Sequence, residues 1–231
     1  MCVEGSAVSQ TNSLLYNSSF CETFEGNGAR AMDYEAILNK VTGHPVEAKI
    51  SFLMEELPHL WRRAYEAMSK RQVSLVRIRQ SSFEYIYDNY CYLEASGVIP
   101  YSLVEDRLVG VLGLSAPQPR LRDDYRLRGW VGPTEKVYGK QFDKGHFIAH
   151  AIGGAVDRSE MNVFVQRRDL NRGWSPEGKL YREMEKYCVS NPGVFCFSRP
   201  LYKDSTSQPT CLEFGILKGT GELWVECFDN R

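Results

Sequence analysis

The segment Gln141-Phe-Asp-Lys-Gly-His-Phe-Ile-Ala-His150 carries two of the four histidines of this 231-residue chain. Four consecutive residues within it suit the hydrolysis of a phosphodiester. His146 would be the general base, and Asp143 would orient its imidazole ring. Lys144 would offer a cation to the phosphate, and Gly145 would let the backbone approach closely. The pKa of an unperturbed histidine, about 6.5, leaves the ring neutral and able to accept a proton near neutral pH.

The spacing of the two histidines leaves a second chemistry open. An i, i+4 pair of histidines on a helix can bind zinc. However, no Glu follows His146 directly, and the sequence offers no obvious third ligand. The zinc interpretation therefore has little support, and a histidine satisfied within a turn is the plainest alternative.

Three further motifs follow the histidine segment in order: Asn162-Val-Phe-Val-Gln166, Asp169-Leu-Asn-Arg-Gly173 and Tyr181-Arg-Glu-Met-Glu-Lys-Tyr187. Together, the four motifs resemble the DNA/RNA non-specific endonucleases of the ββα-metal (His-Me finger) fold, which include EndA-like and mitochondrial endonuclease G-like enzymes. That family has a D-R-G-H element, an N-x-x-x-Q strand, an Asn nine residues after the first Asn, and a helical Glu. Asn171 stands at this nine-residue spacing. The resemblance covers residues 126–231.

The resemblance implies a role for each matching residue. His146 would deprotonate the attacking water, and Asn171 would be the main protein ligand of Mg²⁺, for which Mn²⁺ could substitute. Glu185 would hold the water shell of the metal, and Asn162 would support those waters or the imidazole. One amide oxygen can suffice because Mg²⁺ tends to keep several of its waters.

Two glutamates compete for the helical position. Glu183 and Glu185 both lie in the helix predicted from Lys179 to about Cys188. In the family an apolar residue precedes the Glu and an aromatic residue often stands four positions before it, and this fits Glu185. Residues i and i+4 share a helix face, so Tyr181 and Glu185 should point together. We therefore predict Glu185, with Glu183 as the fallback.

Lys144 departs from the family, which usually has Arg at this position. A guanidinium binds phosphate with a planar fork, whereas an ammonium is a strongly hydrated point charge, so the exchange is not neutral. A compensating arginine could come from four predicted substrate-binding residues: Arg126, Arg128, Arg168 and Arg172.

A second departure is the insert Trp174-Ser-Pro-Glu-Gly178 between Asn171 and Glu185. Its proline and the glycines at its two ends prevent one helix from spanning those residues. We expect a helical turn at Asn171, a separate helix at Glu185, and a loop between them that could touch substrate.

The charge of the chain is unevenly distributed. The whole chain has 28 Lys and Arg, 29 Asp and Glu, a net charge of −1 and 43% hydrophobic residues, as in an ordinary globular protein. Residues 1–116 carry 10 basic and 14 acidic side chains, whereas residues 117–231 carry 18 and 15. Near-neutral charge does not favour nucleic-acid binding. The average is misleading here, because the basic half contains every predicted site residue.

Other features bear on location. No stretch approaches 18 consecutive apolar residues, so we expect no membrane span. The first basic residue is Arg30, so we expect no secretory signal peptide. A cytoplasmic location is the default, and export as an effector by a signal-less route is the alternative. We expect the seven cysteines to be reduced and mostly buried, with one disulfide among the four C-terminal ones as the alternative for an exported protein.

The predicted domain boundary is Ser115-Ala-Pro-Gln-Pro119, because two prolines in three positions favour an extended connector. Residues 1–115 would be a partly helical N-terminal region with a polar start. Apolar residues from about Val46 to Lys70 recur at helical spacing, with Pro58 as a break or new start. Residues 73–93 could form strands or a helix.

Residues 116–231 read mainly as short strands around one helix. Runs of β-branched and aromatic residues predict strands at Met161–Gln166, Val194–Phe197, Cys211–Leu217 and Leu223–Phe228. The predicted fold class is therefore α+β: a ββα-metal core with a mainly antiparallel sheet and flanking helices, preceded by a partly helical N-terminal region.

The leading functional hypothesis is a Mg²⁺-dependent endonuclease of little sequence specificity that acts on DNA, with RNA as a further substrate, in the setting of a toxin or defence effector. Lys144 motivates the alternative of a degenerate nuclease fold that only binds nucleic acid or protein. Residues 1–115 could bind a protein partner or inhibitor, or could simply extend the nuclease sheet.

Overall fold

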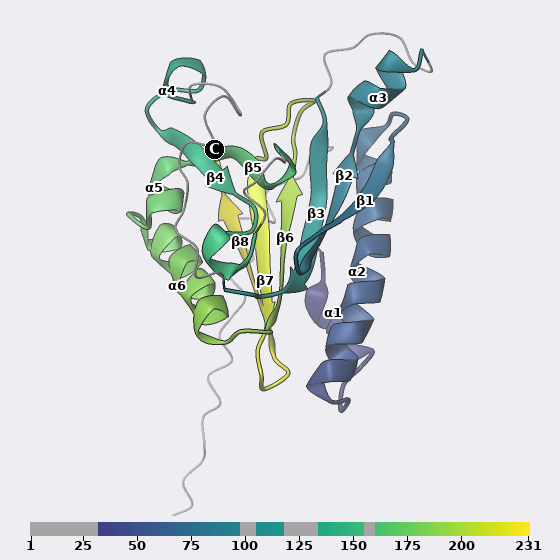
Figure 1. Ribbon diagram of the computed structural model, residues 1–231, viewed down its shortest axis with the longest axis vertical. Helices are drawn as coiled ribbons and strands as arrows, with labels where there is room; N and C mark the ends of the chain where they lie inside the picture. Colours follow the sequence, from purple (N-terminus) through teal and green to yellow (C-terminus); the bar gives the residue numbers. More distant parts are fainter. Residues whose placement is uncertain (1–31, 98–104, 118–133, 155–159) are drawn as a thin grey trace, which may run out of the picture.

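The computed structural model describes residues 32–97, 105–117, 134–154 and 160–231. Its helices and strands, labelled in Figure 1, are α1 (Tyr34–Asn39), α2 (Val46–Ser69), β1 (Leu75–Gln80), β2 (Phe83–Asp88), α3 (Tyr90–Ala95), β3 (Arg107–Leu114), α4 (Thr134–Val137), β4 (Phe142–His146), β5 (Val163–Arg167), α5 (Arg168–Arg172), α6 (Pro176–Ser190), β6 (Phe195–Leu201), β7 (Cys211–Leu217) and β8 (Leu223–Asp229). No helix in these ranges is long and apolar enough to cross a membrane.

Six strands form one sheet in the order β1-β2-β3-β6-β7-β8, and every neighbouring pair is antiparallel. β4 and β5 form a separate antiparallel pair, which α5 follows directly. The predicted α+β class with a mainly antiparallel sheet is thus confirmed. The two strands followed by a helix also match the order of elements in the expected ββα core.

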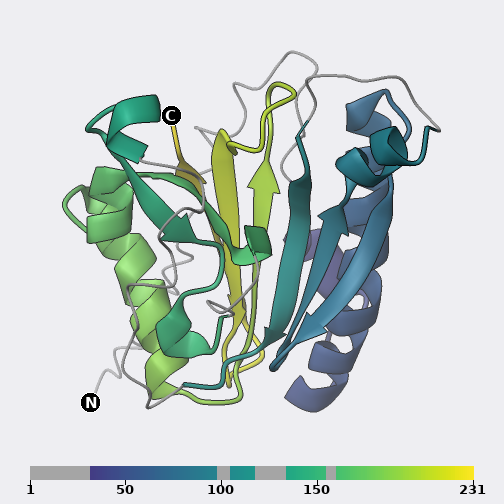
Figure 2. The same ribbon diagram turned by 45° about the horizontal axis from the view of Figure 1, so that its top comes forward.

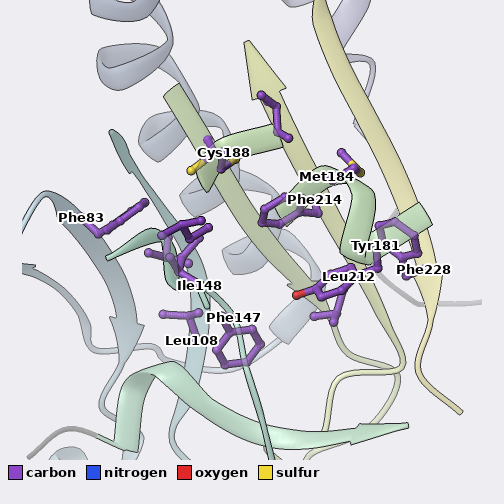
Figure 3. Close-up of a cluster of buried hydrophobic side chains, with 14 of the residues drawn as sticks. Phe83, Leu108, Phe147, Ile148, Tyr181, Met184, Cys188, Leu212, Phe214 and Phe228 are labelled. Atoms are coloured by element: carbon purple, nitrogen blue, oxygen red, sulfur yellow. The ribbon is translucent and has the colours of Figure 1, made fainter. Parts of the chain in front are cut away.

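The sheet is covered on both faces (Figures 1 and 2). α1 and α2 pack on one face, over a core that includes Leu53, Leu57, Trp61, Phe195 and Phe197. α6 and the β4–β5 pair pack on the other face. There Tyr181 of α6 lies against the rings of Phe214 and Phe228, with centroids 5.5 and 5.0 Å away (Figure 3). Strands covered on both faces explain why β6 and β7 are buried along their whole length.

The long amphipathic segment forms one helix, α2, and the predicted break at Pro58 is wrong. Pro58 is buried inside the helix. An interior proline costs about 3 kcal/mol, but the apolar stripe continues on both sides of it, from Leu53 and Leu57 to Trp61 and Tyr65. Burying each of these large side chains contributes about 1.5–3 kcal/mol, so a continuous helix against the sheet is the better arrangement.

Residues 73–93 take the strand alternative over most of their length. β1 and β2 pair as an antiparallel hairpin from Leu75 opposite Asp88 to Gln80 opposite Phe83. In the second half, the four predicted strands and the predicted helix are found to within a few residues, and Cys211–Leu217 has the predicted bounds. Local periodicity was therefore sufficient to find these elements. β4 is a further strand that was not predicted.

The predicted boundary at residues 115/116 lies inside one sheet. β1, β2 and β3 come before it, β6, β7 and β8 come after it, and β3 pairs with β6. The backbone N–H of Ser115 donates to Val194, and that of Ala116 donates to Ile152, at 2.8 and 2.9 Å. The first 115 residues were predicted either to bind a partner or to extend the sheet, and their described part extends the sheet.

The cysteines differ from the expected fully reduced set. Cys188, Cys196 and Cys211 are buried free thiols, and Cys91 is an exposed one. Cys227 is disulfide-bonded. The other three of the four C-terminal cysteines are free, so the disulfide does not lie among those four, as the alternative had placed it.

Trp61→Ala should destabilise the whole sheet. Trp61 is fully buried, its ring lies 5.4 Å from that of Phe197, and a Cβ at Gly110 would come within 2.4 Å of it. We expect the free energy of unfolding to fall by about 3–5 kcal/mol, measured by urea unfolding. Arg62→Ala removes an exposed neighbour in α2 and should cost about 1 kcal/mol or less. Equal effects of the two variants would contradict this packing.

Candidate active site

One pocket of about 230 Å³ gathers the predicted chemistry. It is lined by Lys144, His146, Ala149, His150, Ala151, Gln166, Asn171, Arg182 and Glu185. These residues come from β4, the turn after it, β5, α5 and α6. Four of the predicted site residues, Lys144, His146, Asn171 and Glu185, are therefore brought together although 41 positions separate the first from the last.

The β4–β5 pair positions the base side of the pocket. Its register runs from Phe142 opposite Arg167 to His146 opposite Val163. Lys144 and His146 stand two residues apart in the strand, so their side chains share a face. Burial lowers the pKa of the Lys144 ammonium. The ordinary pKa of a lysine is nevertheless far higher than that of a histidine.

Asp143 was predicted to orient the imidazole of His146, but the hydrogen-bond partners found for its carboxylate lie in α5. It lies three residues from His146 in β4 and so projects to the other face. Its carboxylate accepts hydrogen bonds from Arg168 at 2.9 Å and from Arg172 at 2.6 and 3.1 Å. Partial burial alone would raise the pKa of Asp143, but the two guanidinium groups outweigh it and hold the pKa below its ordinary value.

Two of the predicted substrate-binding arginines are committed to this carboxylate. Arg168 also bonds Glu135 at 2.8 Å, and the guanidinium of Arg172 lies 5.0 Å over the ring of Trp174. Neither lines the pocket. The other two candidates, Arg126 and Arg128, lie outside the described residues. Asp143 therefore fixes α5 against β4, and Arg168 and Arg172 serve that contact.

Asn162 holds the chain that follows His146. Its side chain is fully buried, accepts from the backbone N–H of Ile148 at 2.9 Å and donates to the backbone oxygen of Ile148 at 2.8 Å. Its own backbone oxygen accepts from Phe147 at 3.1 Å. Asn162 is not among the residues that line the pocket, and these hydrogen bonds hold the turn that follows His146.

Gly145 makes room for Gln166 rather than for a ligand. A Cβ at Gly145 would lie 2.2 Å from Oε1 and 2.5 Å from Cβ of Gln166. Gln166 is almost fully buried and lines the pocket. The family-like N-x-x-x-Q strand thus contributes both its end residues: one fixes the turn after β4, and the other forms part of the pocket wall.

The insert divides the helical side of the site as predicted. α5 ends at Gly173, whose φ of +70° is in the left-handed region that favours glycine, and Ser175 caps α6 by accepting from Gly178 at 3.0 Å. This break lets Asn171 of α5 and Glu185 of α6 face one pocket. Trp174, in the loop, is 63% exposed.

Glu185, not Glu183, faces the pocket. Glu185 is buried on the same side of α6 as Tyr181 and Met184, whereas Glu183 is exposed. Burial raises the pKa of the Glu185 carboxyl, and the adjacent guanidinium of Arg182 only partly opposes this increase. The apolar stripe of α6 therefore sets the direction of Glu185, because the helix must bury that stripe against the sheet.

The structure does not favour the zinc interpretation. His146 ends β4 and His150 begins a short 3₁₀ turn, so the two are not one helical pair. Among the described residues, no three His, Cys, Asp or Glu side chains are grouped as metal ligands. The pocket instead offers the amide of Asn171 and the carboxylate of Glu185. Such oxygen donors suit a hard cation that keeps most of its waters.

Three polar residues of the pocket were not predicted as site residues: His150, Gln166 and Arg182. Arg182 is the most informative. Its Nη1 donates to Glu185 Oε2 at 2.7 Å, and its Nη2 donates to the backbone oxygen of Asn171. The signal was present in the i, i+3 spacing of Arg182 and Glu185, which places both on one helix face.

Asp143→Asn should remove a stabilising charge whose effect is lost in acid. Because the folded-state pKa of Asp143 is depressed, its contribution is present above the ordinary pKa of about 3.9 and is lost as the pH falls through the lower folded-state value. We expect the variant to be less stable at neutral pH by about 1 kcal/mol or less, with the difference disappearing in acid. Urea unfolding in buffers from neutral to acid measures this, and a difference that grows in acid would contradict it.

No protein-family model matches the sequence, and no curated protein matches it. Among solved structures, a nuclease described as Sda1 with a bound zinc ion is similar at a TM-score of 0.36 and 13% identity, over 72% of this chain and 81% of that one. An extracellular endonuclease gives 0.35 and 13%, over 69% and 79%. Similarity at this level carries no argument about activity, so the function must be argued from the pocket.

Proposed function

We propose that the protein is a divalent-metal-dependent endonuclease that hydrolyses phosphodiester bonds in DNA, and in RNA as a further substrate. One observation carries the proposal: a histidine, a lysine, an asparagine and a glutamate, each predicted from the sequence for this chemistry, line one pocket. A chance grouping of these four from β4, α5 and α6 would require three separate segments to converge without functional reason.

The reaction needs a base and a means of neutralising charge. His146 would accept a proton from water as the water oxygen forms a bond to phosphorus and the bond from phosphorus to the 3′ oxygen breaks. The departing oxygen would then take a proton from solvent. A positioned base contributes about 10²–10⁴-fold. Lys144 would add a positive charge near the phosphate, within hydrogen-bonding reach of its oxygens once substrate is bound.

Asn171 and Glu185 would hold a hydrated Mg²⁺, for which Mn²⁺ could substitute. The fit rests on their oxygen donors and on the small number of acidic groups in the pocket, which suits an ion bound largely through water. When bound, the metal would supply Lewis-acid stabilisation of the negative charge that develops on the leaving oxygen. Asn171 would contribute its amide oxygen, and Glu185 would orient coordinated water through hydrogen bonds.

We propose low sequence specificity because lysine and arginine would bind the substrate through its phosphates. Contacts to phosphate carry no sequence information. Binding through lysine and arginine also weakens as salt concentration rises. We further propose a setting as a toxin or defence effector, with residues 1–115 available to a protein partner or inhibitor. The competing hypothesis is a fold that binds nucleic acid or protein without cutting nucleic acid.

His146→Ala should abolish most of the nicking activity on supercoiled plasmid in the presence of Mg²⁺. We expect a loss of about 10²–10⁴-fold, because the base is removed and the metal side remains. His59→Ala is the matched control, since His59 is exposed on α2. EDTA should stop cleavage by the wild type. Wild-type cleavage by the His146 variant would refute the proposed role, and DNA binding without any cleavage by the wild type would support the binding module.

Glu185→Gln and Glu183→Gln form a second matched pair on α6. Loss of the buried carboxylate should raise the Mg²⁺ concentration needed for half-maximal cleavage, or lower the rate, by about 10–100-fold. Glu183 is exposed, so its variant should behave as the wild type. Initial rates over a series of Mg²⁺ concentrations measure both. The reverse ranking would transfer the role to Glu183.

A further inference from the structure

Arg182 occupies a bridging position inside the pocket. Its guanidinium donates to the carboxylate of Glu185 at 2.7 Å and to the backbone oxygen of Asn171. It therefore lies between the two residues proposed to hold the metal. Its side chain is 43% exposed, while that of Glu185 is only 11% exposed. Arg182 thus faces the open side of the pocket and Glu185 its floor.

The neighbouring arginines have other partners. Arg167 pairs with Asp169 at 2.6 Å and with Glu177, and Arg168 and Arg172 pair with Asp143. None of these three lines the pocket, and Arg182 is the arginine among the described residues that does. The cation that β4 contributes to the pocket is the ammonium of Lys144, which lacks the planar fork of a guanidinium.

We propose that Arg182 binds the scissile phosphate, supplying from α6 the guanidinium that β4 lacks. This inference rests on the proposed function and names a substrate-binding residue for that same pocket. A guanidinium carries five N–H donors in a planar fork that matches phosphate oxygens. Two of these donors are used within the protein. The remainder can bond a phosphate that enters from the exposed side.

The bond to Glu185 gives the residue a second property. The guanidinium of Arg182 is 43% exposed although its partner Glu185 is buried, so a phosphate on the exposed side can compete for the guanidinium. As Arg182 turns toward the phosphate, the carboxylate of Glu185 is released for the water shell of the metal. Before substrate arrives, the same guanidinium neutralises Glu185 and so competes with a cation for it.

This competition separates a phosphate-binding role from a merely structural one. In Arg182→Ala, the affinity for nucleic acid should fall while the affinity of the substrate-free protein for Mg²⁺ should rise, because Glu185 has lost its guanidinium partner. Damage to the fold would weaken both affinities. Arg182→Lys keeps the charge without the fork and should restore part of the binding to nucleic acid.

The first measurement is binding without catalysis. In the His146→Ala background and in EDTA, fluorescence anisotropy with a short labelled DNA duplex gives the dissociation constant over a range of salt concentrations. We expect Arg182→Ala to weaken binding by about tenfold, as for loss of one charged hydrogen bond. The salt dependence should fall by about one phosphate contact. Lys179→Ala, an exposed lysine earlier on α6, is the matched control and should change neither by as much.

The second measurement is calorimetric titration of the DNA-free protein with Mg²⁺, which should show a lower dissociation constant for Arg182→Ala than for wild type. Urea unfolding shows whether Arg182→Ala is folded. If it is not, Arg182→Gln is used for both measurements. Unchanged DNA affinity, or DNA and Mg²⁺ affinities that fall together in a stable variant, would overturn the inference. If His146→Ala still cleaves DNA as fast as the wild type, the proposed function fails; if it is inactive and Arg182→Ala binds DNA normally, only the role of Arg182 fails.

Discussion

The antiparallel pairing of β3 with β6 is the interaction on which the rest of the structure depends. It joins a strand from the middle third of the chain to one from the last third, from Val111 opposite Ser198 to Leu114 opposite Phe195. The resulting six-stranded sheet has two apolar faces, and each must be covered. α2 covers one face and α6 the other. The acidic first part of the chain, which has no proposed chemistry, is therefore needed to complete the support for the basic part.

The pocket is a consequence of how α6 covers its face of the sheet. Tyr181, Met184 and Cys188 are buried at helical spacing, and this direction also places Glu185 at the edge of the buried stripe. Burial raises the pKa of the Glu185 carboxyl at this position. A buried carboxylate is costly unless a cation or hydrogen bonds compensate it. Arg182 fills that role within the protein, and a hydrated metal would fill it in the proposed enzyme.

The charged side chains around the pocket form two sets: one makes contacts within the protein, and the other lines the pocket. Asp143, Arg168 and Arg172 bind one another and fix α5 against β4. Lys144 and Arg182 face the pocket instead. Both sets look alike in sequence, where each is a charge close to a motif residue. Among the described residues, this division leaves Arg182 of α6 as the arginine that lines the pocket.

Much of the secondary structure and several pocket residues could be predicted from the amino-acid sequence. Hydrophobic periodicity located most strands and helices because it is a local signal, and the resemblance of four motifs to known nucleases selected His146, Asn171 and Glu185. Three features could not be predicted locally: the sheet continues across residue 115, Pro58 does not break α2, and Asp143 bonds to α5. Each of them depends on contacts between segments that are distant in the sequence. β3 pairs with β6 across more than 80 residues of chain, and burial of the apolar stripe of α2 outweighs the local cost of Pro58. Asp143 is held by arginines of α5, and local sequence does not determine which partner a long charged side chain binds.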